Sequence, residues 1–600
     1  MAIGEANGDI TRMLPMWMDS WSNGPGTNPH IYETWRITPL IRPLKQEVLE
    51  NVSELLWVVM GTIGVVMLIA CANVTNLLLV RVEARQRELA IRATLGSGWA
   101  RIVRGLLVES IMLGLAGGVL GVGLAYAGVC LLVAIAPSNL PRLNEIAINA
   151  RTLGFTLIIS VLSGLLFGLI PALKYAGPRN ELALRSGGRT MSVSREQHRT
   201  RNLLVVGQMA MALVLLVSAG LMIRTFELLR TVDPGFADPE HLQLVRISIP
   251  ESLVTEPERV TRIQNAILDK LAAIRGVTGV GFVSQMPMEG FDSSWDEIFA
   301  QDKIYADNTI APLRLYKYAS PGLLQTAGTR LVTGREITWS EIYGLQPVVM
   351  VSENLAREMW GTPSAAIGKH LREFPKMPWH EVVGVVQDVR EKGLQENAPE
   401  IVYWPPLMKD LNGTGPAEAL RTATFVARSE RVGTESFLND VRAAVWSVNG
   451  ELPLASVRTM EEVYDKSVAR TSFTLVMLGI AGAMALALGV IGIYGVMSYT
   501  VSQRKPEIGI RLALGAQQGD VLQIILRQGM KLALVGVASG IVAAFGLTGL
   551  MRSLLFGVTA HDPLTFASVA ALLIVIALLA CYIPARRAIL VDPVVALRYE

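Results

Sequence analysis

Two segments that lie far apart in the chain carry the same charged and apolar residues at the same spacing. The first covers residues 85–96 and the second residues 504–515, and they are offset by 419 residues without a gap. The matching positions are Glu88, Ile91, Arg92, Leu95 and Gly96 in the first segment, and Glu507, Ile510, Arg511, Leu514 and Gly515 in the second. Two distant segments with this much in common indicate an internal repeat.

The chemistry that these residue types support is non-covalent docking. Residues four apart lie on one face of a helix, so Ile510 and Leu514 would form an apolar ridge. Glu507 and Arg511 would form a charged rim beside that ridge, and Gly515 stands where such a helix would end. Charges in this arrangement can also do no more than anchor a loop and fix its topology. The recurrence of the same residues favours a surface that binds a partner.

Motifs for covalent or nucleotide chemistry are missing from the sequence. It contains no Gly-x-x-x-x-Gly-Lys-[Ser/Thr] phosphate loop, no His-Glu-x-x-His and no Gly-x-Ser-x-Gly. The three cysteines lie in apolar runs, and no spacing of cysteines and histidines suits a metal ion. We therefore expect a non-catalytic protein without catalytic residues, metal or cofactor, and no nucleic-acid partner.

Composition places the repeated segments in a membrane protein. The chain is 51% hydrophobic, and its mean hydropathy is +0.40. A helix needs about 20 apolar residues to cross the hydrocarbon core of a bilayer. Seven runs of at least that length contain no Asp, Glu, Lys or Arg: Leu55–Val80, Ser110–Pro141, Thr152–Leu173, Asn202–Ile223, Thr471–Gln503, Leu532–Met551 and Pro563–Ala585. We therefore expect about seven transmembrane helices in the lipid bilayer.

The distribution of basic residues predicts how the chain is oriented. The loop of residues 174–201 carries seven basic residues against two acidic ones, and residues 504–531 carry five against two. The short loops of the opposite side carry only Arg142, Arg151 and Arg552. Because Lys and Arg accumulate on the cytoplasmic side, the N-terminus should be periplasmic and the C-terminus cytoplasmic. An outer N-terminus without a signal peptide leads us to expect that an earlier span and most of an earlier outer domain are missing.

Polar and small residues inside the spans predict close helix packing. Asn73, Thr75 and Asn76 of the first span can form hydrogen bonds between helices or contact a substrate, and we expect the former. The second and sixth spans are rich in glycine, which lets helices approach closely. These glycines are Gly114, Gly117, Gly118, Gly121 and Gly123, then Gly536, Gly540, Gly546 and Gly549.

One long polar segment, residues 224–470, separates the fourth span from the fifth. Residues 258–274 and 436–448 show helical periodicity, and residues 354–360 read as a short helix. Three runs rich in β-branched residues read as strands: residues 277–283, 348–351 and 381–386. An α+β domain outside the membrane is therefore expected.

A second pair of matching sequences shows how far the repeat extends. Pro171-Ala172 followed by Ala183-Leu184-Arg185 matches Pro584-Ala585 followed by Ala596-Leu597-Arg598 at an offset of 413 residues. The repeat unit therefore includes a basic loop, a span, an outward turn, a second span and a Pro-Ala exit.

With these elements in place, the chain resembles the permease of MacB-type and FtsX-like ABC systems, and its duplication resembles the tandem permeases abundant in acidobacteria. The resemblance is carried by residues 69–79 in the first span and 492–497 in the fifth. In the outer segment it is carried by residues 320–322, 333–335, 351–357 and 382–390.

The resemblance implies an α-helical membrane protein of a bacterial inner (plasma) membrane, with two FtsX-like transmembrane repeats and an α+β extracytoplasmic domain. The expected parts are the stub of a truncated first periplasmic domain (1–54), a first FtsX-like domain of three helices (55–175), a cytoplasmic linker (176–201), a transmembrane helix (202–223), a MacB-like periplasmic domain (224–470) and a second FtsX-like domain (471–600).

The resemblance also implies a function. The chain would be a permease subunit that moves its outer domain when a separate ABC ATPase hydrolyses ATP, for efflux or export. The five matching residues of the first segment would contact one ATPase subunit, and those of the second segment would contact the other. A periplasmic adaptor or an outer-membrane component would be a further partner. The alternative is a signalling transmitter that acts on an envelope enzyme or sensor without moving a substrate. A secondary transporter is disfavoured because the charge-free runs contain no ionisable site.

Overall fold

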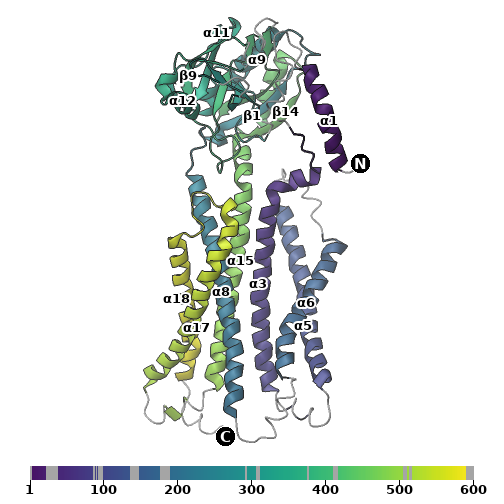
Figure 1. The fold of residues 1–600 in the computed structure, drawn as a ribbon, viewed down its shortest axis with the longest axis vertical. Helices are drawn as coiled ribbons and strands as arrows, with labels where there is room; N and C mark the ends of the chain where they lie inside the picture. The colour runs from purple at the N-terminus through teal and green to yellow at the C-terminus, as the bar shows by residue number, and fades with distance from the viewer. Residues whose placement is uncertain are drawn as a thin grey trace. The chain divides into compact units, whose positions relative to one another are not determined.

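The structure is a computed structural model of the 600-residue chain, and its fold is drawn in Figure 1. It describes residues 3–21, 38–85, 88, 91, 99–135, 148–175, 190–290, 294–305, 311–373, 377–409, 417–503, 508, 510–511 and 517–589. The chain forms two compact units, one of residues 51–226 and 473–600 and one of residues 1–50 and 227–472.

The first unit is a bundle of long apolar helices. Its elements are α3 (Leu44–Ala84), α5 (Trp99–Ile135), α6 (Ala150–Tyr175), α8 (Thr190–Arg230), α15 (Met460–Gln503), α17 (Gln518–Leu547), η3 (Thr548–Leu554) and α18 (Pro563–Ile589). Within the described residues, seven helices are long and apolar enough to cross a membrane. Each contains most or all of one of the charge-free runs, so the predicted spans are confirmed.

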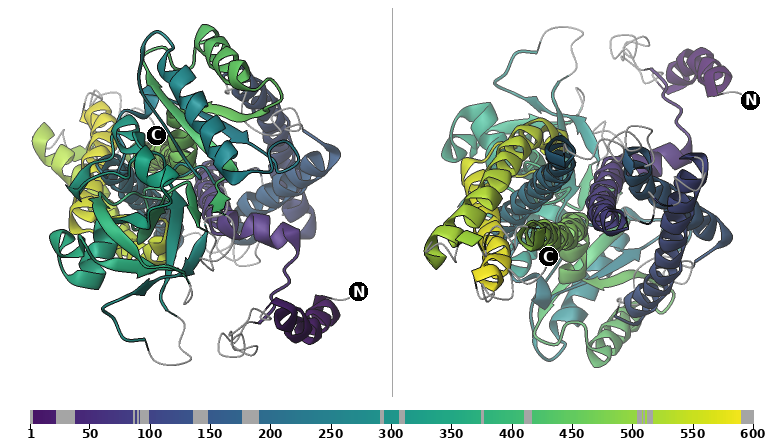
Figure 2. Two further views of the ribbon diagram at one scale, coloured as in Figure 1. Left: turned by 90° about the horizontal axis from the view of Figure 1, so that it is seen from above. Right: turned by 90° about the horizontal axis from the view of Figure 1, so that it is seen from below.

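The bundle is built around α8 and α15. Buried side chains of α8, α15, α17 and α18 form one cluster, which includes Leu213, Met497, Val537 and Leu573. Helix α3 joins this centre where Ile69 packs with residues of α8 and α15. Helices α5 and α6 pack mainly on each other, whereas α17 and α18 pack on each other and also on α8 and α15 (Figure 2). The two helix pairs therefore lie in different environments although they occupy the same place in the repeat.

Close packing at glycine holds for only some of the predicted positions. A Cβ on Gly114 would stand 2.5 Å from the backbone oxygen of Ser160, and one on Gly540 would stand 2.9 Å from the Cβ of Leu213. Gly118 and Gly536 face neighbouring helices in the same way. The prediction is wrong for the other glycines, which have nothing within 4 Å of a Cβ: Gly117, Gly121, Gly123, Gly546 and Gly549. A helix turns only one face to its neighbour, so glycines on its other faces contribute no helix contact.

Substituting glycine on the two faces of α5 should separate these environments. We expect Gly114→Ala to destabilise the bundle by about 1–3 kcal/mol, because the new methyl group meets backbone that cannot move cheaply. The matched control Gly121→Ala should be neutral, or more stable by about 0.5–1 kcal/mol through helix propensity. Thermal unfolding of the full chain in detergent measures both, and equal effects would contradict the packing of α5 on α6.

The outer unit contains a four-stranded antiparallel sheet in the order β14-β1-β13-β2. Its strands are β1 (Leu242–Ser248), β2 (Val277–Val283), β13 (Thr422–Ser429) and β14 (Leu454–Thr459). Helices α9 (Pro257–Ala272) and α14 (Glu435–Val448) cover one face, where Ile267 and Phe437 are fully buried. This βαββαβ order is that of a ferredoxin-like fold. The chain between β2 and β13 is an insertion in that fold.

The insertion forms a second, eight-stranded sheet in the order β3-β5-β10-β7-β9-β8-β4, with β6 paired to β9. Its strands are β3 (Trp295–Glu297), β4 (Phe299–Ala300), β5 (Leu313–Tyr318), β6 (Leu331–Gly334), β7 (Val348–Ser352), β8 (His370–Arg372), β9 (His380–Val386) and β10 (Ile401–Trp404). The remaining elements are η2 (Pro239–His241), α10 (Leu323–Ala327), α11 (Trp339–Tyr343), α12 (Glu353–Trp360), α13 (Pro363–Ala366), β11 (Leu407–Lys409) and β12 (Ala417–Ala419). All six elements predicted from the sequence in this segment are confirmed within two residues.

Two boundaries differ from those expected. Residues 3–21 form helix α1 (Ile3–Trp21), although the N-terminal segment looked irregular in sequence. Ile3, Ile10, Met13 and Trp17 recur there at helical spacing, which a search for long apolar runs does not detect. Helix α8 begins at Thr190, so the end of the expected linker is helical. The polar residues there extend a span instead of ending it.

A buried carboxyl in the outer unit carries a strongly altered pKa. Glu373 directly follows β8 and is 2% exposed. Burial, and to a smaller extent the neighbouring Asp296 carboxyl, raises the pKa of Glu373 to about 8. The folded protein therefore holds a proton on Glu373 that the unfolded chain, with a glutamate pKa of about 4, releases.

This proton should make the outer unit less stable at high pH. Between about pH 5 and pH 8 the folded state binds more protons than the unfolded state, so its stability falls as pH rises. The effect is absent below the unfolded pKa and complete above about pH 8. We expect the opening free energy of β5 and β8, measured by hydrogen exchange in the full chain and corrected for the intrinsic pH dependence of exchange, to fall over this range. Glu373→Gln should remove most of that slope; an unchanged slope would contradict the assignment.

Candidate functional site

The repeated segments are described in part. Glu88, Ile91, Ile510 and Arg511 lie in helical turns next to α3 and α15. Arg92, Leu95, Gly96, Glu507, Leu514 and Gly515 lie outside the described residues. A shared apolar ridge and charged rim therefore stay predictions, and only the described positions can be placed.

Each segment has a described residue that contacts other side chains and an isoleucine that is exposed. In the first, Arg85 Nε donates to Glu88 Oε2 at 2.9 Å, while Ile91 is 59% exposed. In the second, Ile508 is buried in the core of the bundle, while Ile510 is 48% exposed. Each segment thus presents an exposed isoleucine at the matching position of the repeat.

A buried polar cluster joins the helices that lead into the two segments. Arg201 of α8 forms an ion pair with Glu83 of α3, and their side chains are only 4% and 8% exposed. Tyr499 of α15 donates its hydroxyl to Glu83 Oε2 at 2.6 Å. The Arg201 guanidinium also stacks over the Tyr499 ring, 4.2 Å from its centroid. We call Glu83, Arg201 and Tyr499 the inner triad.

The inner triad connects the two repeats next to the candidate partner surface. Glu83 lies two residues before Arg85, at the start of the first segment, and Tyr499 lies five residues before Arg504, at the start of the second. Displacing either segment therefore acts on the same buried charges. Sequence reasoning placed Glu83 and Arg201 in polar loops, because the charge-free runs end before them. In the sequence, the triad was indicated only by the nearness of Glu83 to the end of the first run and of Arg201 to the start of the fourth.

A second polar cluster lies deeper in the bundle. Asn73 Nδ2 of α3 donates to the backbone oxygen of Leu488 in α15 at 2.8 Å, which confirms the predicted hydrogen bond between helices. Gln208 of α8 is 1% exposed, and neither atom of its amide has a hydrogen-bond partner among the described residues. Gly492 lies between the two amides, because a Cβ there would stand 2.6 Å from Asn73 Oδ1. Three central helices thus meet at side-chain amides and a glycine.

No group of three or more metal-ligating side chains occurs within the described ranges. The site contains ion pairs, amides and exposed apolar residues. This arrangement suits mechanical contact between helices and a partner.

The repeat is also recognised by comparison with known proteins. The model of the FtsX-like permease C-terminal family matches residues 60–178 and 479–593. The chain therefore contains two regions that are similar to FtsX-like permeases. The two matched regions begin 419 residues apart, which is the offset of the two repeated segments. The duplication predicted from the sequence is therefore confirmed, and so is a helical membrane protein with an α+β outer domain.

Curated relatives of this permease are proteins of the PvdT and MacB type. It is 29% identical over 277 residues to the pyoverdine export ATP-binding/permease protein PvdT of Pseudomonas syringae, covering 45% of this chain and 40% of that protein. It is 28% identical over 295 residues to the macrolide export ATP-binding/permease protein MacB of Rhodopseudomonas palustris, covering 45% and 41%. The permease thus spans about two fifths of the length of these relatives. Over the matched stretch it is similar to MacB-type proteins.

Solved structures of outer domains also match the permease. The periplasmic region of MacB from Actinobacillus actinomycetemcomitans is 14% identical, covering 39% of this chain and 94% of that structure with a TM-score of 0.24. A domain of a permease from Porphyromonas gingivalis is 18% identical, covering 36% and 90% with a TM-score of 0.23.

The inner triad should contribute strongly to the stability of the bundle. Arg201→Ala leaves the buried Glu83 carboxylate without its counter-charge, and we expect a loss of about 3 kcal/mol or more. The matched control Arg199→Ala removes an exposed guanidinium two residues away and should change stability by less than about 0.5 kcal/mol. Thermal unfolding in detergent compares them. A loss as small for Arg201 as for Arg199 would show that the triad does not hold the bundle together.

Proposed function

We propose that this chain is the non-catalytic permease subunit of an ABC transporter in a bacterial inner membrane. A separate ATPase binds the two repeated segments from the cytoplasm, and its cycle moves the outer domain for efflux or export. The observation that carries the proposal is the duplicated segment with an exposed isoleucine at the matching position, Ile91 and Ile510. The FtsX-like regions of the chain and the export permeases among its relatives support the same reading.

The inner triad supports a mechanical role for these contacts. Each of its charges is buried, so the cluster favours a few discrete arrangements over continuous deformation. Two of its members lie on α8 and α15, the helices that continue along the chain into the outer domain. Helix α15 begins at Met460, directly after strand β14 ends at Thr459. Helix α15 is therefore adjacent in sequence to β14, an edge strand of the ferredoxin-like sheet.

The positive-inside bias predicts on which side of the membrane each end of the chain lies. The repeated segments would be cytoplasmic, the outer domain periplasmic, the N-terminus periplasmic and the C-terminus cytoplasmic. On this topology an ATPase reaches both segments at once, and a periplasmic adaptor or outer-membrane component reaches the outer domain.

Charge reversal within the two segments tests the partner surface. We expect Arg92→Glu combined with Arg511→Glu to abolish co-purification with the cognate ATPase, because truncating or reversing an interface anchor costs about 2 kcal/mol or more at each site. Arg527→Glu changes an exposed residue of α17 outside the repeated segment of residues 504–515. It is the charge-matched control and should leave the complex intact. A complex that survives the double reversal would contradict the assigned contact.

Export and signalling are separated by a second measurement. Cells that lack the gene should accumulate the exported compound if the chain moves a substrate. A signalling transmitter would leave compound levels unchanged and would retain an envelope enzyme or sensor on residues 230–465 of the full chain.

A further inference from the structure

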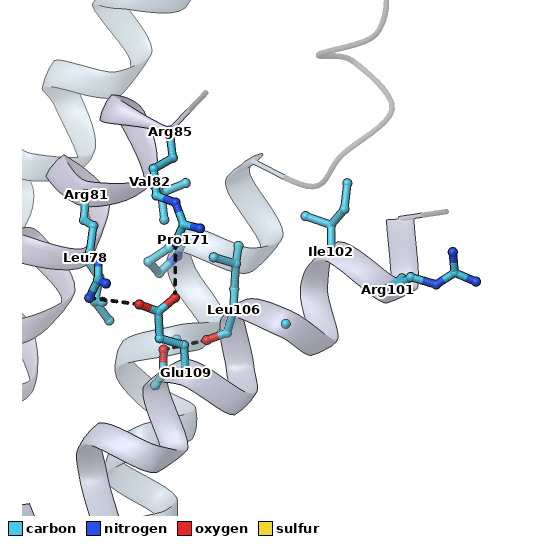
Figure 3. Close-up of a pocket in the computed structure, with 12 residues that line it drawn as sticks. Leu78, Arg81, Val82, Arg85, Arg101, Ile102, Leu106, Glu109 and Pro171 are labelled. Carbon is cyan, nitrogen blue, oxygen red and sulfur yellow. Dashed lines mark hydrogen bonds and ion pairs between the residues drawn. The ribbon is translucent and has the colours of Figure 1, made fainter. Parts of the chain in front are cut away.

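A cavity of about 200 Å³ lies between α3, α5 and α6 in the first repeat, beside the start of the first repeated segment. Leu78, Val82, Leu106 and Pro171 form an apolar wall (Figure 3). Ile102 is a further apolar residue of the lining, and the remaining residues are charged or small. The cavity is therefore amphiphilic, with an apolar side and a charged side, and it does not overlap the inner triad.

The charged side of the cavity carries more cations than anions. Arg81 and Arg85 from α3 and Arg101 from α5 line it, against the single carboxylate of Glu109. Arg81 pairs with Glu109 at 2.9 Å and Arg85 approaches it at 3.7 Å. Arg85 is also shared with Glu88, which lies outside the lining. Even with Glu88 counted, three guanidiniums face two carboxylates.

Arg101 supplies the excess charge. Its side chain extends away from Glu109, whereas Arg81 and Arg85 both point toward that carboxylate (Figure 3). No ion pair of Arg101 with another described residue is found in the structure. Guanidiniums from two different helices thus flank a cavity that holds only one internal anion. An anion that enters would be attracted by this excess of positive charge, and guanidinium groups can form bidentate hydrogen bonds to it.

The surroundings of the cavity indicate which anion this is. Only 6% of the most apolar stretch of α5 is buried in protein, the smallest share among the seven spans of the described chain. Val108 and Met112, a turn or two beyond the charged residues, are more than half exposed. Side chains of this kind contact lipid tails. A ligand with a phosphate at the charged side and acyl chains along α5 matches both halves of the lining.

We propose that this cavity binds the phosphate headgroup of an anionic phospholipid. The phosphate lies between Arg101 and the α3 arginines, and the acyl chains lie against α5. The site includes Arg85 of the first repeated segment, but a lipid can bind there without an ATPase or the exported cargo. A lipid bound there stands next to the first repeated segment, so the charge of the membrane can bias the position of that segment.

Gly105 allows the site to be blocked without disturbing the fold. It lines the cavity, and a Cβ placed on it would meet nothing within 4 Å. A leucine at this position therefore has room for its Cβ at the cavity wall, adds apolar bulk there and raises helix propensity. Gly117 on the same helix also has nothing within 4 Å but lies outside the cavity. Gly117→Leu is thus the matched control for Gly105→Leu.

The test is native mass spectrometry of the delipidated full chain, titrated with phosphatidylglycerol or with phosphatidylcholine of the same acyl chains. We expect the wild type and Gly117→Leu to bind the first phosphatidylglycerol about 10-fold more tightly than phosphatidylcholine. Gly105→Leu should lose that preference. Arg101→Gln should weaken phosphatidylglycerol binding about fivefold, the effect of one guanidinium near a membrane surface.

Three outcomes would overturn the proposal. One is equal binding of the two lipids by the wild type, and another is an unchanged preference in Gly105→Leu. The third is displacement of phosphatidylglycerol by 10 mM inorganic phosphate beyond that caused by chloride at the same ionic strength, which would identify a site for free phosphate. Thermal unfolding of each variant in detergent verifies that it is folded before titration.

Discussion

A charge inside a membrane-spanning bundle must find a partner, because no water is available to solvate it. In the inner triad, Glu83 is paired with Arg201 and accepts a hydrogen bond from Tyr499, and the three residues lie on three different helices. Helix α3 belongs to the first repeat, α15 to the second, and α8 connects the two. The requirement to keep these charges paired thus ties the repeats together at the end that carries both repeated segments.

The duplication does not produce two equivalent environments. Helices α17 and α18 of the second repeat share a large apolar core with α8 and α15, whereas α5 and α6 rest mainly on each other. Apolar contact gives little driving force between helices in lipid, so small residues and polar contacts decide where they pack. Gly540 places α17 against α8, and Gly114 places α5 against α6. The more lipid-exposed α5 is also the helix that completes the cationic cavity.

Much of the architecture follows from simple features of the sequence. The absence of charge over 20 or more residues is unusual in soluble helices, so all seven spans could be located, although the helices α3, α5, α8, α15 and α17 begin well before the runs. Three strands of the outer domain were recognisable because β-branched runs such as residues 277–283 are bounded by turn residues. The insertion of one sheet within a ferredoxin-like fold could not be predicted, because it depends on pairing between strands more than 100 residues apart.

The site was less accessible to prediction than the fold. The recurrence of residues pointed to Ile91 and Ile510, and both are exposed in the structure. The inner triad was missed because Glu83 and Arg201 are 118 residues apart and each looks like a loop residue by itself. Gln208 was missed for a similar reason, since one amide in an apolar run gives no hint of the amide it faces. Contacts between helices are set by packing, which local patterns do not encode.

The central claim is that both repeated segments face the cytoplasm, where a separate ATPase can reach them. Its most direct test is cysteine accessibility of Ile91→Cys and Ile510→Cys, each in a Cys130→Ser background that removes the exposed native thiol. A membrane-impermeant maleimide should label both positions in inside-out vesicles and neither in right-side-out vesicles. Labelling of either position from the periplasmic side would contradict the account.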